Sequence, residues 1–381
     1  MKVRIRDIGE IYTGNTPSKK NILYWNSDDI GFVKPDIIAD DAIIRINKEK
    51  CKEFISFCAI DKARIVPKNS VFVTCIGSIG KIGISKDRLA FNQQINAIVP
   101  NKNIDKEYLA YALYANKKKL QNIANAPVVP IINKTQFNDF ELNIEFDTNK
   151  QYQITETLNI ISTILDKMNK ELELLDELVK ARFVEMFGDM KPTVKLNKYI
   201  IELRAGKSLA GNEICKNKVL KTGAATFGFF DKDQYKYYPK EYKPNPLHKV
   251  ETGDVIISRM NTPELVGACS YVYEAPDNTY YPDRLWKVIV NENTNPIFLW
   301  QLMWQQEIRK QIKENSYGTS GTMNNISKIK LLNINAIDVP ISLQNQFADF
   351  VKEVDKSRLE VQKSLKKTQE LFDSLIQKYF G

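Results

Sequence analysis

The chain has 381 residues, of which 43% are hydrophobic, enough for about two or three domains with well-filled cores. It contains one histidine and neither a G-x-S-x-G nor an H-E-x-x-H motif, which argues against a serine hydrolase and against a histidine-ligated metal enzyme. No apolar run reaches the roughly 18 residues of a membrane span, the first residues hold no apolar signal segment, and the cysteines form no C-x-x-C pair, so we expect a cytoplasmic protein with reduced thiols.

The net charge of +9 is spread unevenly along the chain. Residues 1–146 and residues 191–342 each carry a net charge of +6, whereas residues 147–190 between them carry −4. Basic blocks favour a polyanionic partner, although lysines that only keep the surface hydrated are the alternative. The acidic segment is better suited to contact a protein than the phosphates of DNA.

The first block begins with a predicted loop at residues 13–20, where Gly, Asn, Pro and Ser interrupt regular structure. Its hydroxyls, amide and two lysines suit contacts to phosphates and base edges. Short β-rich runs at residues 65–66 and 71–73 predict strands, and residues 105–121 predict an amphipathic helix capped by Asp105.

Three glycines and Lys81 within residues 75–84 look at first like a nucleotide-binding loop. A P-loop requires Ser or Thr directly after its lysine, and Ile82 stands there instead. We therefore expect a glycine-rich strand and turn whose backbone approaches a neighbour closely. Amides follow at Gln93 and Gln94, and they fit either core hydrogen bonding or the reading of bases.

Residues 151–188 form the most regular stretch of the chain. Apolar residues recur there at alternating steps of four and three, which is the a/d pattern of a coiled-coil seam. The predicted seam comprises Ile154, Leu158, Ile161, Leu165, Met168, Leu172, Leu175 and Val179.

The same stretch returns 193 residues later, and a chain that repeats at about half its length is built as two copies of one unit. Arg358 and Thr368 occupy the positions that Leu165 and Leu175 occupy in the first copy, so the second seam is more polar. At these two positions we expect the pair of helices either to have its register fixed or to pack more loosely. The second predicted seam comprises Phe347, Val351, Val354, Val361, Leu365, Phe372 and Leu375.

Residues 191–342 repeat the plan of the first block, including a second predicted amphipathic helix at residues 296–313. The loops differ strongly between the copies, which suggests the same task on two targets. Eight tyrosines between Tyr235 and Tyr281 alternate with lysines. Such mixing suits nucleic acid, but half-buried strands are equally rich in tyrosine.

These motifs, in this order, resemble the specificity subunit of a type I restriction–modification enzyme over essentially the whole chain. The resemblance rests on Gly14–Ser18, Gly77–Lys81 and Asn92–Ala97 in the first copy, and on Gly253–Arg259 and Leu265–Gly267 in the second. The second copy lacks the Thr-Pro of the first loop.

The resemblance implies a mixed α/β fold with two target recognition domains, at residues 1–146 and 191–342. Two long helices, at residues 147–190 and 343–381, would join them as an antiparallel coiled coil, with a pseudo-twofold internal repeat. Each block directly precedes its helix, so antiparallel pairing puts the blocks at opposite ends. A helix of about 38 residues is roughly 57 Å long, which exceeds the roughly 34 Å of one DNA turn.

The resemblance also implies a non-catalytic subunit that reads a bipartite, asymmetric site on double-stranded DNA. Two methyltransferase subunits would dock on the outer surface of the coil, with Phe187 and Phe380 at its ends as candidate contacts, and restriction and translocase subunits would complete the complex. We expect no catalytic residue, metal or cofactor in this chain, since S-adenosylmethionine, ATP and Mg belong on the partners.

Hydroxyl, amide and cationic side chains of the loops are the expected DNA contacts. Two alternatives stay open. One is a nuclease or methyltransferase whose site the motifs do not reveal, and the other is a coiled-coil scaffold, which leaves two basic blocks with divergent loops unexplained. The predicted DNA-binding residues are Thr13, Asn15, Thr16, Ser18, Lys19, Lys20, Ser78, Lys81, Gln93, Gln94, Lys207, Ser208, Lys218, Arg259, Asn261 and Arg284.

Overall fold

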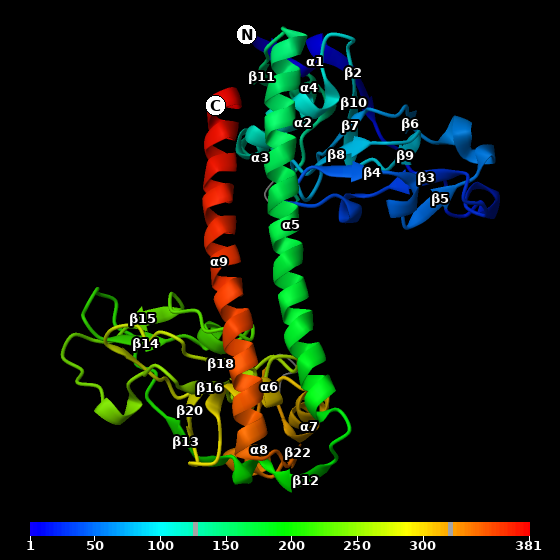
Figure 1. Ribbon diagram of the computed structural model, residues 1–381. Coiled ribbons are helices and arrows are strands. Elements are labelled where there is room, and N and C mark those ends of the chain that lie inside the picture. Colours follow the sequence, from blue (N-terminus) through cyan, green and yellow to red (C-terminus); the bar gives the residue numbers. More distant parts are fainter. Residues whose placement is uncertain (125–128, 319–322) are drawn as a thin grey trace. The chain divides into compact units, whose positions relative to one another are not determined.

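The computed structural model describes residues 1–124, 129–318 and 323–381, which divide into two units (Figure 1). Unit 1 comprises Met1–Lys170 and Gln362–Gly381, and unit 2 comprises Glu171–Val361. The long helices α5 (Thr148–Phe187) and α9 (Ile341–Phe380) each contribute one end to each unit. Within the described ranges, none of the helices combines the length and apolar character needed to cross a membrane.

Unit 1 is built on a five-stranded sheet in the order β2-β10-β7-β8-β4, antiparallel except for the β4–β8 pair. Strands β7 and β8 are buried along their whole length, which fits their runs of β-branched and aromatic residues. The strands are β2 (Gly9–Thr13), β4 (Ile44–Ile46), β7 (Val71–Thr74), β8 (Ile82–Ser85) and β10 (Ile95–Pro100).

A second sheet of unit 1 has the order β5-β3-β9-β6, and a short pair joins β1 to β11. These strands are β1 (Lys2–Arg4), β3 (Ile30–Val33), β5 (Glu53–Ile55), β6 (Ile65–Val66), β9 (Leu89–Phe91) and β11 (Glu141–Asn143). The short helices are α1 (Ile5–Ile8), α2 (Lys106–Ala115), α3 (Lys117–Ile123) and α4 (Lys134–Asn138).

Unit 2 repeats this plan with a four-stranded antiparallel sheet in the order β13-β20-β16-β18. Its smaller sheets are β15-β14-β19, β12-β22 and β17-β21. The strands are β12 (Pro192–Lys195), β13 (Ile200–Ala205), β14 (Lys218–Leu220), β15 (Tyr235–Tyr237), β16 (Val255–Ser258), β17 (Met260–Asn261), β18 (Cys269–Tyr271), β19 (Thr279–Tyr280), β20 (Leu285–Val290), β21 (Asn324–Asn325) and β22 (Asn335–Ile337). The helices are α6 (Pro296–Met303), α7 (Gln306–Asn315) and α8 (Lys328–Leu332).

The two predicted amphipathic helices are each broken in two, which corrects the sequence prediction. Asp105 does cap α2, because its carboxylate accepts from the backbone N–H groups of Glu107 and Tyr108. Asn116 then ends α2, and its side chain donates to the carbonyl of Ala112 at 2.9 Å. The second helix breaks at Trp304, between α6 and α7. Apolar spacing continues across both breaks, so the periodicity did not reveal them.

A buried glutamine at the start of each long helix holds the beginning of a shorter helix, α2 in unit 1 and α6 in unit 2. In unit 1 the side chain of Gln151 accepts from the N–H of Asp105 at 2.7 Å and donates to the carbonyls of Asn103 and Glu145. In unit 2 the side chain of Gln344 accepts from the N–H of Asn295 at 2.9 Å and makes the matching two donations. The repeat therefore extends from the sequence to individual hydrogen bonds.

Each unit pairs one end of α5 with the opposite end of α9. In unit 1 the core includes Leu158 and Ile161 from α5 and Phe372 from α9, and in unit 2 it includes Val179 from α5 and Phe347 from α9. The chain order of these contacts is that of an antiparallel pair. Together with the two α/β units, this confirms the predicted fold class.

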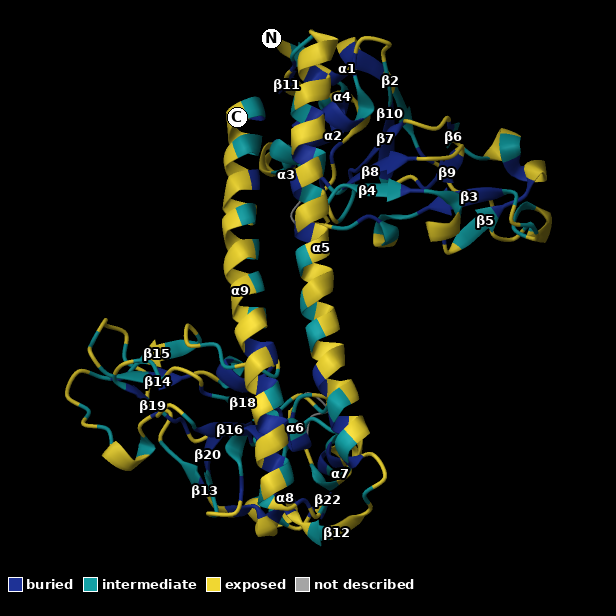
Figure 2. Cartoon of the chain, in the orientation of Figure 1, coloured by how far each residue is buried: buried dark blue, intermediate teal, exposed yellow. Residues whose placement is uncertain are grey.

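The phenylalanines at the ends of the long helices are core residues, which corrects their prediction as docking contacts. Phe187 is 2% exposed, with its ring 5.5 Å from that of Phe298 and 5.6 Å from that of Phe347. Phe380 is 1% exposed, and its ring lies 5.1 Å from that of Tyr108. Figure 2 shows buried and exposed residues alternating along α9. Neither ring is available to a partner, because each closes the core of its own unit.

The remaining seam positions show graded burial. Leu165, Val351 and Val354 are buried. The half-buried seam positions are Ile154, Met168, Leu172, Leu175, Val361, Leu365 and Leu375. In unit 2, Arg358 does not pack as an apolar seam residue. Its guanidinium contacts the carboxylate of Asp176 on α5 at 2.7 Å.

Candidate nucleic-acid interface

In unit 1 the predicted DNA-binding residues converge on one end of the five-stranded sheet. Asn96 pairs with both Thr13 and Val73, so the end of β2, the end of β7 and the start of β10 share one edge. The loop at residues 14–20, the turn at residues 75–81 and residues 92–94 all lie at that edge. We call these three segments the first rim.

Hydrogen bonds order the polar side chains of the first rim. The hydroxyl of Thr16 donates to Oε1 of Gln93 at 2.6 Å, and the side chain of Asn15 donates to the carbonyl of Lys62 at 2.9 Å. The side chain of Asn92 donates to Oε1 of Gln94 at 2.9 Å. Gln93 is exposed and Gln94 half-exposed, so both amides are fixed and also accessible.

The glycine-rich turn of the first rim approaches a neighbour closely, as predicted. Gly77 and Gly80 both have φ near +80°, a conformation that favours glycine. A Cβ on Gly80 would lie 2.9 Å from the side chain of Lys117. Ser78 is exposed at the tip, and Lys81 is half-exposed at the start of the returning strand.

Other predicted residues of the first rim differ in availability. Lys20 and Ser18 are exposed. Lys19 is already engaged, since its ammonium lies 2.6 Å from the carboxylate of Glu53 and 3.8 Å from the centre of the Trp25 ring. Thr13, which directly precedes the first rim, is half-exposed with its hydroxyl buried, and its contact with DNA stays a prediction.

In unit 2 the predicted residues gather at the equivalent end of the four-stranded sheet. Ala205, at the end of β13, pairs with Trp286, and Ser258, at the end of β16, pairs with Leu285. The residues that follow these strand ends, or precede β20, therefore lie at one edge. This second rim contains Lys207, Ser208, Arg259, Asn261, Asp283 and Arg284.

Arg259 and Asn261 are held by neighbours in unit 2. The Nε of Arg259 donates to Oδ1 of Asn325 at 3.3 Å, and its guanidinium lies 5.9 Å from the centre of the Trp286 ring. The side chain of Asn261 donates to the hydroxyl of Thr226 at 3.4 Å. These contacts leave both side chains half-exposed and restrict their orientation.

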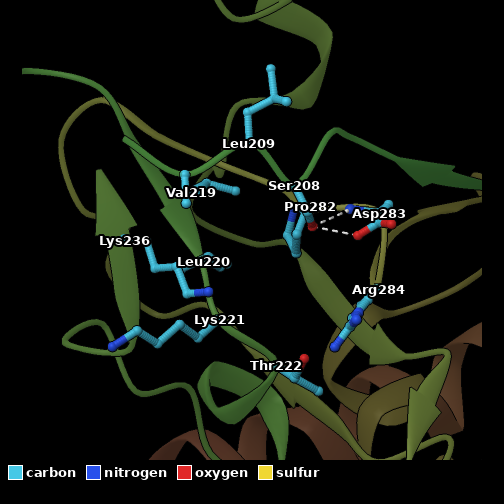
Figure 3. A pocket seen from close by; sticks show the side chains of 11 residues that line it. Ser208, Leu209, Val219, Leu220, Lys221, Thr222, Lys236, Pro282, Asp283 and Arg284 are labelled. Carbon is cyan, nitrogen blue, oxygen red and sulfur yellow. Dashed lines mark hydrogen bonds between the residues drawn. The ribbon is translucent and has the colours of Figure 1, made fainter. Parts of the chain in front are cut away.

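A cavity of about 430 Å³ opens beside the second rim (Figure 3). Arg284 and Asp283 line it from one side, and Lys221 and Lys236 from the other. The hydroxyl of Ser208 donates to the Asp283 carboxylate, and the N–H of Asp283 donates back to that hydroxyl at 3.3 Å. The cavity is thus rich in cations and contains one carboxylate.

His248 lies beside the positive charge of the second rim. Burial, and then the charges of Arg204 and Lys207, lower the pKa of this imidazole below its ordinary value. The imidazole therefore stays neutral to a lower pH than an ordinary histidine does. Lys207 itself is exposed, in a position to meet an anion.

The comparisons with known proteins agree on one family. A family model described as the type I restriction modification DNA specificity domain matches residues 1–176. The MjaIX specificity subunit of Methanocaldococcus jannaschii is 27% identical over 195 residues, which span 50% of this chain and 44% of that protein. The MjaVIII specificity subunit of the same organism is 22% identical over 343 residues, 82% of this chain and 80% of the relative.

Residues 1–176 thus match the type I DNA specificity domain, and the chain is similar to type I specificity subunits. A solved structure, the S subunit of a type I restriction–modification system from M. genitalium, matches with a TM-score of 0.62 at 15% identity, covering 100% of this chain and 96% of that one. At this level of identity the likeness shows a shared fold. The match spans less than half of the MjaIX relative.

Three residues of the second rim were missed by sequence reasoning. Lys221 and Lys236 come from the small sheet β15-β14-β19 and the segment after it, and only the fold brings them to Arg284. Asp283 directly precedes a predicted residue but was not itself predicted. Lys218, which was predicted, lies on β14 with its ammonium 4.5 Å from the Tyr235 ring.

Proposed function

We propose that this chain reads a bipartite, asymmetric site on double-stranded DNA for a type I restriction–modification system, one half-site per unit. The observation that carries the proposal is the pair of rims. Each unit collects hydroxyl, amide and cationic side chains at the same end of the same sheet, but with different residues. The names of the related proteins, each a type I specificity subunit, support it.

The target recognition domains are proposed at residues 1–146 and 191–342, with the long helices as spacers at residues 147–190 and 343–381. Exposed lysines such as Lys20 and Lys207 neutralise phosphates, which makes the affinity fall as salt rises. The rim amides and arginines contact base edges in the major groove. The two rims differ in side chains, so the half-sites differ in sequence.

We propose that methyltransferase subunits dock on the outward faces of the long helices. In unit 1, α5 exposes Tyr152, Ile160 and Ile164 along a groove of about 500 Å³ that α2 borders. Exposed apolar residues at this spacing on one helix face suit a protein partner. A similar fold of TM-score 0.56 comes from a study of complex assembly of the type I restriction–modification system.

Catalysis is assigned to the partners: S-adenosylmethionine to the methyltransferase subunits, and ATP and Mg to the restriction and translocase subunits. The function of this chain is to position a target adenine where a methyltransferase flips it out of the duplex. Methyl transfer by the purified chain alone, incubated with DNA and S-adenosylmethionine, would contradict this division of labour.

An exchange of residues 191–342 for those of another family member tests the two-reader proposal. We expect the methylated motif in a host that carries the exchanged gene and its methyltransferase to change in one half-site only. The reciprocal exchange of residues 1–146 is the control and changes the other half-site. Alteration of both half-sites by either exchange contradicts the proposal.

A further inference from the structure

Two equivalent positions on the rims carry opposite hydrogen-bonding groups. Strands β10 and β20 begin at Ile95 and Leu285, and both starting residues are buried after two accessible ones. Gln93 lies two residues before Ile95, and Asp283 lies two residues before Leu285, so the two residues occupy equivalent positions. Thr13 pairs with the second residue of β10 and Ala205 with the second residue of β20, which fixes the alignment of the facing loops.

The facing loop supplies a hydroxyl to each position. Three residues after Thr13 and after Ala205 stand Thr16 and Ser208, and each donates its single hydroxyl hydrogen to the residue opposite. The Thr16 to Gln93 distance of 2.6 Å is typical of an O–H···O bond and shorter than an N–H···O bond, which identifies Oε1 as the acceptor. The same scaffold bond therefore exists in both units.

The hydroxyl occupies one oxygen of the side chain in each unit. The group left for a ligand differs, because an amide also has an NH₂ group and a carboxylate has a second oxygen. With its Oε1 engaged, the amide of Gln93 presents its Nε2, which is a donor only. Ser208 engages one oxygen of Asp283, so the carboxylate presents its other oxygen, which is an acceptor only. Both side chains are exposed at their rims.

We infer that Gln93 and Asp283 are specificity-determining residues of opposite sense. Resting on the proposed function, Gln93 selects a base edge that accepts a hydrogen bond, such as a purine N7 or thymine O4. Asp283 selects an exocyclic amino group, cytosine N4 or adenine N6. A carboxylate would otherwise repel DNA phosphates, and Lys221, Lys236 and Arg284 around the same cavity offset that repulsion (Figure 3).

The neighbouring residues extend the contrast. Gln94 accepts at Oε1 from Asn92, so it too presents a donor, next to the donor of Gln93. Arg284 presents guanidinium donors beside the acceptor of Asp283, and guanine O6 and N7 are the usual partners of arginine. The first unit thus offers two donors side by side, and the second an acceptor beside a donor.

The test selects duplexes from a randomised DNA library with the full-length chain. In Asp283→Asn the Ser208 hydroxyl still engages Oδ1, and the group presented becomes an N–H donor. In Gln93→Glu a carboxylate oxygen replaces the amide Nε2, so the group presented becomes an acceptor. We expect each variant to alter base preference at one position of its own half-site, by about 10-fold or more against the original base. Lys236→Met, in the same cavity, is the control and lowers affinity evenly across sequences.

Three outcomes decide the matter. Altered preference at one position, in the expected sense for each variant, supports the inference. An unchanged motif with uniformly weaker binding gives Asp283 a loop-closing role and overturns the inference, while the selected motif still supports the proposed function. A wild-type chain that enriches no sequence overturns the proposed function itself, and the inference falls with it.

Discussion

Four strands correspond between the main sheets of the two units, β2-β10-β7-β8 and β13-β20-β16-β18, but they are built around different cores. In unit 1, Ala97 lies at the centre of β10, paired with Phe72 of β7 and Tyr12 of β2. In unit 2 the equivalent residue is Lys287, paired with Ile256 of β16 and Arg204 of β13. The strand register is the same although a methyl group has become a buried lysine, so the register depends on the backbone and on the surrounding apolar residues.

The buried lysine of unit 2 comes with its own partners. Lys287 lies 3.0 Å from the carboxylate of Asp254 and 2.5 Å from that of Glu251, and the hydroxyl of Tyr281 donates to Asp254 at 3.0 Å. At the position of Asp254, unit 1 has Ser70, a buried neutral residue. The polar groups of unit 2 therefore form one interdependent set, and unit 1 achieves the same sheet without it.

The largest expected effect comes from breaking this set. Lys287→Met leaves Asp254 buried without its cation, and removal of one partner of a buried ion pair costs about 3–5 kcal/mol in the free energy of unfolding. Hydrogen exchange of the β16 and β20 amides in the full chain measures the loss in unit 2.

The control removes both charges. In Lys287→Met with Asp254→Ser, the serine hydroxyl stands as it does at Ser70, and we expect most of the lost stability to return. The β7 and β10 amides of unit 1 should exchange as in the wild type in both variants. If Lys287→Met alone had a free energy of unfolding within about 1 kcal/mol of the wild type, the ion pair would not stabilise the sheet.

The second prediction concerns a feature that the units share. Gln151→Met and Gln344→Met keep the side-chain volume but leave one N–H and two carbonyls unpaired in each unit, and we expect a cost of about 2–4 kcal/mol each. The neighbouring Gln153 and Gln346 are exposed, and their replacement by methionine should cost less than about 0.5 kcal/mol. Urea unfolding measures these costs. Equal losses of stability at the buried and the exposed glutamines would contradict a stabilising role for the hydrogen bonds of Gln151 and Gln344.

The sequence predicted the long helices and the repeat because apolar spacing is a local property of the chain. It could not predict which of two repeated glutamines is buried, since that depends on the helix packed above it. Nor could it predict the partners of Lys287: in the run Leu285–Val290 one lysine among apolar residues is typical of a half-buried strand.

Prediction of the candidate site had a similar limit. Residue type and loop position identified most rim residues, because hydroxyls, amides and cations in loops suit DNA. The hydrogen bond between Ser208 and Asp283 spans 75 positions and depends on the register of two strands. The group that each side chain still presents follows from that bond, so it became visible only in the folded chain.

The smallest expected effect lies where the long helix α9 meets unit 2. Asp355 accepts a hydrogen bond from the Tyr273 hydroxyl, and Arg358 and Asp176 lie close by. Burial above all raises the pKa of this carboxyl above its ordinary 3.8, with Asp176 adding to the rise and Tyr273 and Arg358 opposing it. At the equivalent position of unit 1 stands Ser162, which interacts with Tyr111 and does not titrate.

Because folded Asp355 holds its proton more tightly than the unfolded chain does, its contribution to stability is greatest at low pH and declines as the pH rises from 3.8 through the raised pKa. Asp355→Asn, whose carbonyl still accepts from Tyr273, removes that decline. We expect the variant to match or exceed the wild type at pH 7, by about 1 kcal/mol or less, and the difference to shrink as the pH falls toward 3.8. Thermal unfolding across this range measures the difference in stability, and Ser162→Ala is the control, for which we expect no pH-dependent difference. A wild type that is more stable than Asp355→Asn at pH 7, and loses this advantage as the pH falls, would mean that the ionised carboxylate, through Arg358, stabilises unit 2 more than its burial costs.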